Sequence, residues 1–191
     1  MTPALSLPAG TQARPGAATT ATAEPRGQYL TFTLGDEFFA LDIRSVREII
    51  QCCPMTAVPL MPNFVRGVIN LRGAVVPVID LHARFGRRAA ALGKKSCIVI
   101  FEALREGERE RVELGLLVDS VSEVIEIGAN AIEPAPNFGA SVRRDFIRGM
   151  GKVEVRRTGA SRFVIILEAD KAFDVGEMAQ LCDEAQAALA A

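Results

Sequence analysis

The sequence predicts a mainly β protein that forms small barrels, because short apolar segments alternate with turn-forming residues along most of the chain. The chain has 191 residues, 49% of them hydrophobic, which is enough to build a core in one domain or in two small units packed together. The clearest strand covers residues 29–34, where Leu30, Phe32 and Leu34 alternate with Tyr29, Thr31 and Thr33. This period of two residues is typical of a half-buried strand.

The sequence around this strand predicts a tail before it and a hairpin after it. Residues 1–27 are rich in Ala, Thr and Pro and carry no apolar periodicity, so we expect a disordered tail there. Gly35 and Asp36 predict a tight turn, and residues 38–41 predict the strand that returns from it.

A short helix is predicted after this hairpin, with Asp42 as its N-cap. Arg44 and Glu48 would lie four residues apart on its outer face. The inner face would carry the apolar residues Ile43, Val46 and Ile50. Three prolines, Pro54, Pro59 and Pro62, then predict a loop.

Residues 64–81 predict two strands joined by a tight turn. Apolar residues run almost unbroken on both sides of Gly73, which can take the positive φ that such a turn requires. Asn70 and Arg72 are the polar exceptions, and we expect an arginine at this turn to project outward. A short turn over residues 81–86 and a polar connector follow.

The second half of the chain predicts two more hairpins and a final helix. Strands are expected at residues 96–104 and 113–119, on either side of a charged loop over residues 105–111, and at residues 147–155 and 162–167, on either side of Gly159. An amphipathic C-terminal helix is expected over residues 176–191, where apolar residues recur at helical spacing: Met178, Leu181, Ala185 and Leu189.

The composition argues against several classes of function. The formal net charge is −1, which disfavours a general nucleic-acid binder and adsorption to an anionic membrane, so we expect no nucleic-acid partner and no direct membrane contact. No apolar run approaches the ~20 residues of a membrane helix, and the N-terminus lacks the pattern of a signal peptide. The four cysteines show no disulfide-framework spacing, which is typical of reduced thiols in a cytoplasmic protein.

The sequence shows no constellation of catalytic residues. It contains one histidine, His82, and it lacks a nucleophile elbow, a phosphate-binding glycine loop and paired metal-ligating histidines. A zinc site made of Cys52, Cys53 and His82 would need a fourth ligand, and the spacings do not favour one. We therefore expect no catalytic residue, no metal and no cofactor. Asp80 and Asp119 follow apolar strands and are expected to cap the next turns.

Several motifs in a fixed order carry a resemblance to one family. They are residues 29–37, residues 40–49, the run Asn-Leu-Arg-Gly-Ala-Val-Val-Pro-Val-Ile-Asp-Leu at residues 70–81, the Val-Asp-x-Val-x-x-Val segment within residues 116–124, and residues 132–136. Together they resemble the CheW family, the coupling proteins of bacterial chemotaxis, over roughly residues 28–181.

The resemblance implies a fold and a function. The fold is two SH3-like five-stranded β-barrels packed side by side, with short helices, a C-terminal helix and a nominal boundary near residue 93. In that family the first strand can cross into the second barrel. The function is that of a non-enzymatic adaptor in the cytoplasm, recruited to membrane receptor arrays. Its implied partners are the cytoplasmic tip of a methyl-accepting chemotaxis receptor and the regulatory domain of the histidine kinase CheA.

The resemblance also assigns residues to these two contacts. Val46, Glu48 and Arg72 fall on positions used to bind the receptor, and Cys97 occupies another position of the same groove. Phe138 matches an aromatic residue that makes a second contact with the kinase. The family often has a basic residue where this chain has Glu133, so the charge beside Phe138 is reversed.

Two alternatives stay open at this point. A small-barrel protein can instead bind a ligand or nucleic acid without signalling partners, and phosphate binding would then weaken steeply with added salt. Packing of a barrel by Val46, and an ordinary solvated turn at Arg72, are the simpler structural roles of those two residues. The chemosensory pathway is not distinguished, since flagellar motility, pilus motility and second-messenger control all use such adaptors.

Overall fold

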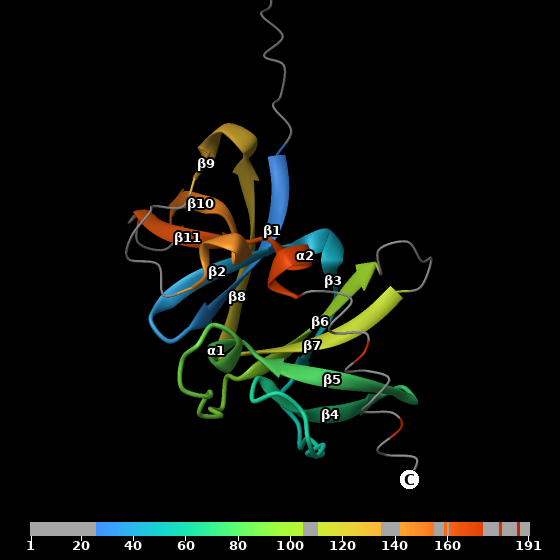
Figure 1. Cartoon of the computed structure of the whole chain (residues 1–191). Coiled ribbons are helices and arrows are strands. Elements are labelled where there is room, and N and C mark those ends of the chain that lie inside the picture. The colour runs from blue at the N-terminus through green and yellow to red at the C-terminus, as the bar shows by residue number, and fades with distance from the viewer. Residues whose placement is uncertain are drawn as a thin grey trace, which may run out of the picture.

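Two β-sheets packed against each other form the described part of the chain (Figure 1). The computed structural model describes residues 26–104, 111–134, 142–154, 159, 161–173, 180 and 187. The six-stranded sheet has the order β8 (Ser120–Gly128), β1 (Arg26–Leu34), β2 (Glu37–Asp42), β11 (Ser161–Leu167), β10 (Ile147–Glu154) and β9 (Ile132–Glu133). The five-stranded sheet has the order β3 (Val46–Gln51), β6 (Cys97–Leu104), β7 (Arg111–Val118), β5 (Ala74–Asp80) and β4 (Val65–Leu71).

The six-stranded sheet is curled, and its two edge strands follow each other in the sequence. Its edge strands β8 and β9 are separated only by the 3-10 turn η2 (Ala129–Ala131). Counted as one interrupted strand, β8 and β9 make this a five-stranded barrel, as predicted. The inside of the curl holds a buried cluster of Tyr29, Ala40, Ile125, Ile127, Val164 and Ile166.

The five-stranded sheet closes in a similar way. The chain after its edge strand β3 reaches the other edge strand, β4, at Thr56. The Thr56 amide donates to the Val68 carbonyl at 2.9 Å, and the Val68 amide donates to the Thr56 carbonyl at 2.8 Å. This closure encloses a second buried cluster, which consists of Ile69, Val76, Val78, Ala90, Ile98, Ile100 and Leu117.

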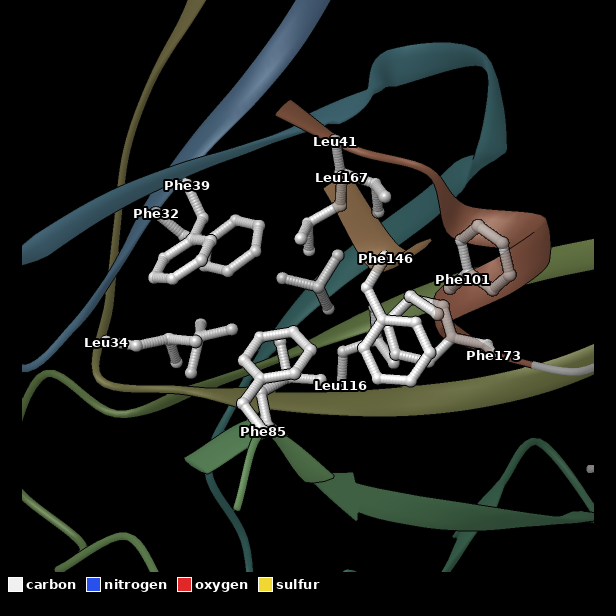
Figure 2. Close-up of a cluster of buried hydrophobic side chains, with 14 of the residues drawn as sticks. Phe32, Leu34, Phe39, Leu41, Phe85, Phe101, Leu116, Phe146, Leu167 and Phe173 are labelled. Carbon is white, nitrogen blue, oxygen red and sulfur yellow. The ribbon is translucent and has the colours of Figure 1, made fainter. Parts of the chain in front are cut away.

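A third and larger cluster fills the space between the two sheets, and we call it the shared core (Figure 2). The rings of Phe32 and Phe39 stack at 5.9 Å, and the ring of Phe85 stacks on Phe39 at 5.8 Å. Phe101 from the five-stranded sheet packs against Phe173, with ring centroids 5.4 Å apart. Because both sheets supply these rings, neither sheet completes its packing without the other.

The division between the sheets is not a single cut in the chain. The β1–β2 hairpin pairs with β8 through β1 and with β11 through β2, so the first strands lie with the last ones. The strands β3 to β7 between them form the other sheet. The prediction of a mainly β protein with two small barrels side by side is confirmed.

The prediction of a short helix after Asp42 is correct only for the first turn. The Asp42 carboxylate does cap it, accepting from the Arg44 amide at 3.0 Å, but the helix is the single 3-10 turn η1 (Ile43–Ser45). Residues Val46–Gln51 form the strand β3, paired with β6. The β-branched residues Val46, Ile49 and Ile50 favour an extended backbone. Pairing with β6 therefore selects the strand, although the apolar spacing also fits a helix.

The other predicted strands are confirmed within a few residues at each end. The connections near β5 and β10 contain α1 (Leu81–Arg84) and η3 (Arg144–Phe146), and α2 (Ala169–Ala172) follows β11. Three predictions lie outside the described residues. They are the tail over residues 1–27 except its last two residues, which begin β1; the loop over residues 105–111 except Arg111, which begins β7; and the apolar residues of the C-terminal helix.

Candidate partner-binding surfaces

The turn between β4 and β5 presents Arg72 to solvent. Arg72 has φ +54° and Gly73 has φ +92°, so both central residues of this two-residue hairpin loop have positive φ. Such loops match the right-handed twist of the strands. The Asn70 side-chain oxygen accepts from the Gly73 amide at 2.9 Å and fixes the turn. The predicted turn is confirmed, and the Arg72 side chain is 72% exposed.

Glu48 lies within reach of this arginine. The Arg72 guanidinium donates to Glu48 Oε2 at 3.0 Å, which connects the β4–β5 turn to the middle of β3. The Glu48 side chain is only 23% exposed, and its Oε1 is buried without a hydrogen-bond partner among the described residues. The pair therefore uses only one of the two carboxylate oxygens of Glu48, and the other lies buried beneath it.

Val46 and Cys97 stand at opposite ends of the β3–β6 ladder. Val46 is opposite Phe101, and Cys97 is opposite Gln51, which puts about 15 Å of strand between the two sites. Both side chains are half-buried and pack against the shared core. The Cys97 thiol donates to the Lys95 carbonyl at 3.2 Å. The structure thus brings Glu48 and Arg72 together, but it does not bring Cys97 to them.

Ile49 is a candidate that the sequence did not reveal. It lies on β3 opposite Val99, whose side chain is in the shared core, and the residue is 43% exposed. The predicted helix did not place Ile49 on its inner face, whereas the strand puts it on the same face as Val46, with Glu48 on the opposite face. Three of the five residues at 46 to 50 are β-branched, which favours an extended backbone and was the signal that could have found it.

Arg47 holds the start of this edge strand in place. The ladder shifts by one residue between Val46 and Glu48, so Arg47 lies at a bulge. Its guanidinium bonds to Glu113 on β7 and to Glu102 on β6, the latter at 3.3 Å. These bonds fix the backbone that carries Val46 and Glu48.

The second predicted surface is described only in part. Glu133 is the last residue of β9, it pairs with Met150 of β10, and it is exposed. Phe138 lies outside the described residues. The assignment of these two residues to a kinase contact stays a prediction.

Asp80 caps the next turn as predicted, whereas Asp119 bonds to a turn elsewhere in the chain. Asp80 Oδ1 accepts from the amides of His82 at 3.0 Å and Ala83 at 3.3 Å, at the start of α1. Asp119 Oδ2 accepts from the Gly35 amide at 2.6 Å and lies 3.0 Å from His82 Nε2. These contacts give His82 a structural role at the junction of the sheets.

The zinc site considered from the sequence is not formed. Cys52 and Cys53 pack against the cluster inside the five-stranded sheet, away from the junction that holds His82. Within the described ranges no group of three His, Cys, Asp or Glu side chains is placed to hold a metal ion. Burial raises the pKa of the Cys52 thiol, which favours its neutral form.

One carboxylate near β3 is electrostatically stabilised. The side-chain hydrogen bonds from Arg44 hold the pKa of Asp42 below its usual value. Arg44 therefore pairs with Asp42, and the expected spacing of Arg44 and Glu48 on one helical face does not occur.

None of the helices in the described ranges has the length and apolar character needed to cross a membrane.

Comparison with known proteins identifies the family. The model of the CheW-like domain matches residues 28–177. A chemotaxis protein CheW from Rhizobium meliloti is 36% identical over 146 residues, which are 76% of this chain and 86% of that protein. A chemotaxis protein CheW from Klebsiella aerogenes is 32% identical over 152 residues, which are 80% of this chain and 84% of that protein.

A solved structure agrees with this match. The crystal structure of the scaffolding protein TtCheW from Thermoanaerobacter tengcongensis is similar with a TM-score of 0.64 at 34% identity, over 78% of this chain and 88% of that chain. Fold, ordered motifs and sequence similarity over most of the chain lead to the same conclusion. The protein belongs to the family of CheW-like domains.

Proposed function

We propose that this protein is a chemotaxis coupling adaptor that holds a methyl-accepting receptor and the kinase CheA in one signalling complex in the cytoplasm. The observation that carries the proposal is the match to the CheW-like domain over residues 28–177. Two sheets that share one core suit this role, because preorganised surfaces lose less entropy when partners bind. The adaptor itself has no turnover and needs no cofactor.

The receptor surface in this proposal lies along β3 and the β4–β5 turn. A helix of the receptor tip placed along the edge strand β3 would contact Val46 and the exposed Ile49. Glu48 would hold Arg72 in place through their ion pair, and Arg72 would donate to a carboxylate or to terminal carbonyls of the helix. Cys97 lies at the other end of the β3–β6 pair from Val46, so the receptor helix would reach it only if it ran along the whole length of β3.

The kinase surface in this proposal includes Glu133 and Phe138. An apolar anchor carries much of the energy of such a contact, whereas the neighbouring charge selects the partner. Glu133 is exposed on the six-stranded sheet, and the receptor surface lies on the five-stranded sheet. One rigid molecule would therefore hold the two partners at a fixed relative position.

A charge-exchange experiment tests the receptor surface. Arg72→Glu should weaken binding of a receptor-tip fragment by about 1–3 kcal/mol, since it removes a charge-assisted donor and adds repulsion with Glu48. The thermal unfolding curve should change little, because exposed ion pairs contribute roughly 0–1 kcal/mol to stability. Calorimetric titration gives the affinity, and circular dichroism gives the stability.

The double variant Glu48→Arg/Arg72→Glu separates two roles of the arginine. Restored affinity would show that the pair is needed for its geometry, and lost affinity would show that the receptor contacts Arg72 itself. Unchanged affinity in the single variant would remove Arg72 from the surface. An adaptor must bind both partners. If the wild-type chain failed to bind a receptor fragment, or failed to bind a CheA regulatory fragment, in size-exclusion chromatography, the adaptor function would be rejected.

A second experiment tests the reversed charge at Glu133. We expect the cognate kinase to offer a basic residue there, because like charges at a contact are repelled. Glu133→Arg should move the preference toward kinase domains from systems with a basic adaptor residue, and Phe138→Ala should weaken both pairings. Association is measured at low and moderate salt. If Glu133→Arg leaves the preference unchanged while Phe138→Ala weakens binding, the charge does not select the partner.

A further inference from the structure

The segment of residues 81–87, which we call the α1 clasp, follows a strand of one sheet and contacts the other sheet. It comes directly after β5 of the five-stranded sheet and begins with α1. In Figure 1, α1 lies where the lower sheet meets the upper one. Leu81 and Phe85 are buried in the shared core, and the polar side chains between and after them reach the six-stranded sheet and its connections.

Arg84 makes the central contact of the α1 clasp. Its guanidinium carbon lies 4.5 Å from the centroid of the Phe64 ring and 5.5 Å from the centroid of the Phe146 ring. Its Nε donates to the Ala172 carbonyl at 3.1 Å. Phe64 precedes β4 of the five-stranded sheet, whereas Phe146 and Ala172 belong to η3 and α2, which flank strands of the six-stranded sheet. One half-buried arginine therefore connects the two halves.

Two further contacts of the α1 clasp lie on its other side. His82 Nε2 is 3.0 Å from Asp119 Oδ2, and the same oxygen accepts from the Gly35 amide in the β1–β2 turn. Arg87 donates to the Leu34 carbonyl at 3.3 Å and pairs with Glu37 at the start of β2. The α1 clasp thus contacts the six-stranded sheet on both sides of the shared core.

We propose that Arg84 is a positioning residue that sets the angle between the two sheets, and through it the relative position of receptor and kinase. This inference rests on the proposed function, since it is about how one adaptor serves both partners. Arg84 is not among the residues proposed for either partner surface. Its loss should therefore leave each partner's own contact intact and impair only their coupling.

The chemistry of this contact requires an arginine. A planar guanidinium can stack on aromatic rings and at the same time donate from an edge nitrogen in a fixed direction. A lysine ammonium carries the charge but not this fixed geometry. The exposed Arg143 offers a comparison, because its guanidinium lies 5.0 Å from the same Phe146 ring but its side chain is 71% exposed and pairs with Asp145 only two residues away.

The first test compares single-partner affinity with coupling. Arg84→Met keeps the length of the side chain and removes the charge and the donor. We expect affinities for a receptor-tip fragment and for a CheA regulatory fragment within about twofold of wild type, and receptor-dependent stimulation of CheA autophosphorylation reduced about fivefold or more. Arg84→Lys should restore part of the stimulation, and the matched variant Arg143→Met should leave it unchanged.

The second test measures the geometry without any partner. Spin labels at Gln51 and Lys152, both exposed and one on each sheet, report the distance between the sheets in a background with the four native cysteines replaced by serine. Arg84→Met should broaden or shift this distance distribution, and Arg143→Met should not. If Arg84→Met does not fold, Phe146→Leu takes its place. It removes the ring on which Arg84 stacks and should also broaden or shift the distance distribution.

Each outcome decides the inference. An unchanged distance distribution in both Arg84→Met and Phe146→Leu would overturn it, and so would an equal loss of single-partner affinity and stimulation in Arg84→Met. If the wild-type chain bound neither fragment, the proposed function would fail, and the distance measurement would still show whether Arg84 sets the angle between the sheets.

Discussion

At the scale of single residues, the closure of the five-stranded sheet depends on a glycine. Gly67 has φ +148°, and a Cβ built on it would lie 2.5 Å from the Thr56 carbonyl oxygen. That oxygen accepts from Val68, so the backbone of the loop occupies the space that any side chain would need. The sequence gives no sign of this close approach, because it depends on a contact between segments eleven residues apart.

Gly67→Ala should therefore destabilise the protein strongly. The methyl group would have to displace the Thr56 backbone and its two hydrogen bonds, which we expect to cost about 2–4 kcal/mol of unfolding free energy. Urea unfolding followed by circular dichroism measures the loss. Gly35→Asn is the matched control, because Gly35 has φ +62° with open space around it and asparagine tolerates that conformation. Equal stability of Gly67→Ala and Gly35→Asn would mean that the loop moves aside without cost.

The β4–β5 turn of the candidate site could be predicted from the sequence, but the ion pair between Arg72 and Glu48 could not. Gly73 and the outward Arg72 follow from local rules for hairpin loops, and the structure confirms both. The partner of Arg72 is Glu48, which lies 24 residues earlier in the chain. No local rule connects them, since the contact exists only because β3 and the β4–β5 turn meet in the folded sheet.

At the scale of elements, β3 shows how two periods compete in one short segment. Residues 43–50 fit a helix with an apolar face, and they also fit a strand with β-branched residues. Pairing with β6 supplies backbone hydrogen bonds that an isolated helical turn cannot match, and β3 alternates between half-buried and exposed positions. Its neighbour η1 keeps only the N-terminal cap that the sequence predicted.

Ile49→Thr tests the role of this strand in binding. Threonine keeps the β-branch and so preserves the strand, and we expect a change below about 0.5 kcal/mol in stability at this exposed position. Loss of apolar contact should weaken receptor binding by roughly three- to tenfold, corresponding to about 1 kcal/mol. Calorimetric titration with the receptor-tip fragment gives the affinity. The same substitution at the exposed Val124 of β8, on the other sheet, should leave this affinity unchanged. An unaffected affinity in Ile49→Thr would place the receptor helix elsewhere.

One strand was missed although its pattern was visible. β8 covers Ser120–Gly128, where Val121, Ile125 and Ile127 alternate with polar residues and glutamates. The charged residues hide the period, because β8 faces the cluster inside the curl only through its second half. The bend at η2, which lets the same segment serve both edges of the sheet, has no local signal of its own.

At the scale of the whole molecule, the family and the two-barrel architecture could be predicted because several motifs occur in a fixed order. That prediction is confirmed by the match over residues 28–177. The packing of the sheets was beyond the reach of sequence patterns. A period of two residues shows which side chains face inward, but it does not show that Phe101 of one sheet and Phe39 of the other lie in a single core.

Because the core is shared, the two sheets should unfold together. The chain has no tryptophan and a single tyrosine, Tyr29, which is 3% exposed in the six-stranded sheet. Phe101→Ala removes a buried ring of the five-stranded sheet and should cost about 3–5 kcal/mol. We expect the urea midpoint seen by Tyr29 fluorescence to fall together with the midpoint seen by circular dichroism. A Tyr29 transition that stays at the wild-type midpoint would show that the sheets unfold independently.

The pairing of the first hairpin with the last strands has a consequence for synthesis on the ribosome. Residues 46–118 contain all strands of the five-stranded sheet, so these strands can begin to pair while later residues are still being added. The β1–β2 hairpin emerges first, but β11, its partner beside β2, ends only at Leu167. At about 5–20 residues per second, the apolar face of that hairpin waits on the order of ten seconds for its neighbour. Among the described strands, the β1–β2 hairpin is therefore the part most exposed to aggregation and to chaperones in the newly made protein.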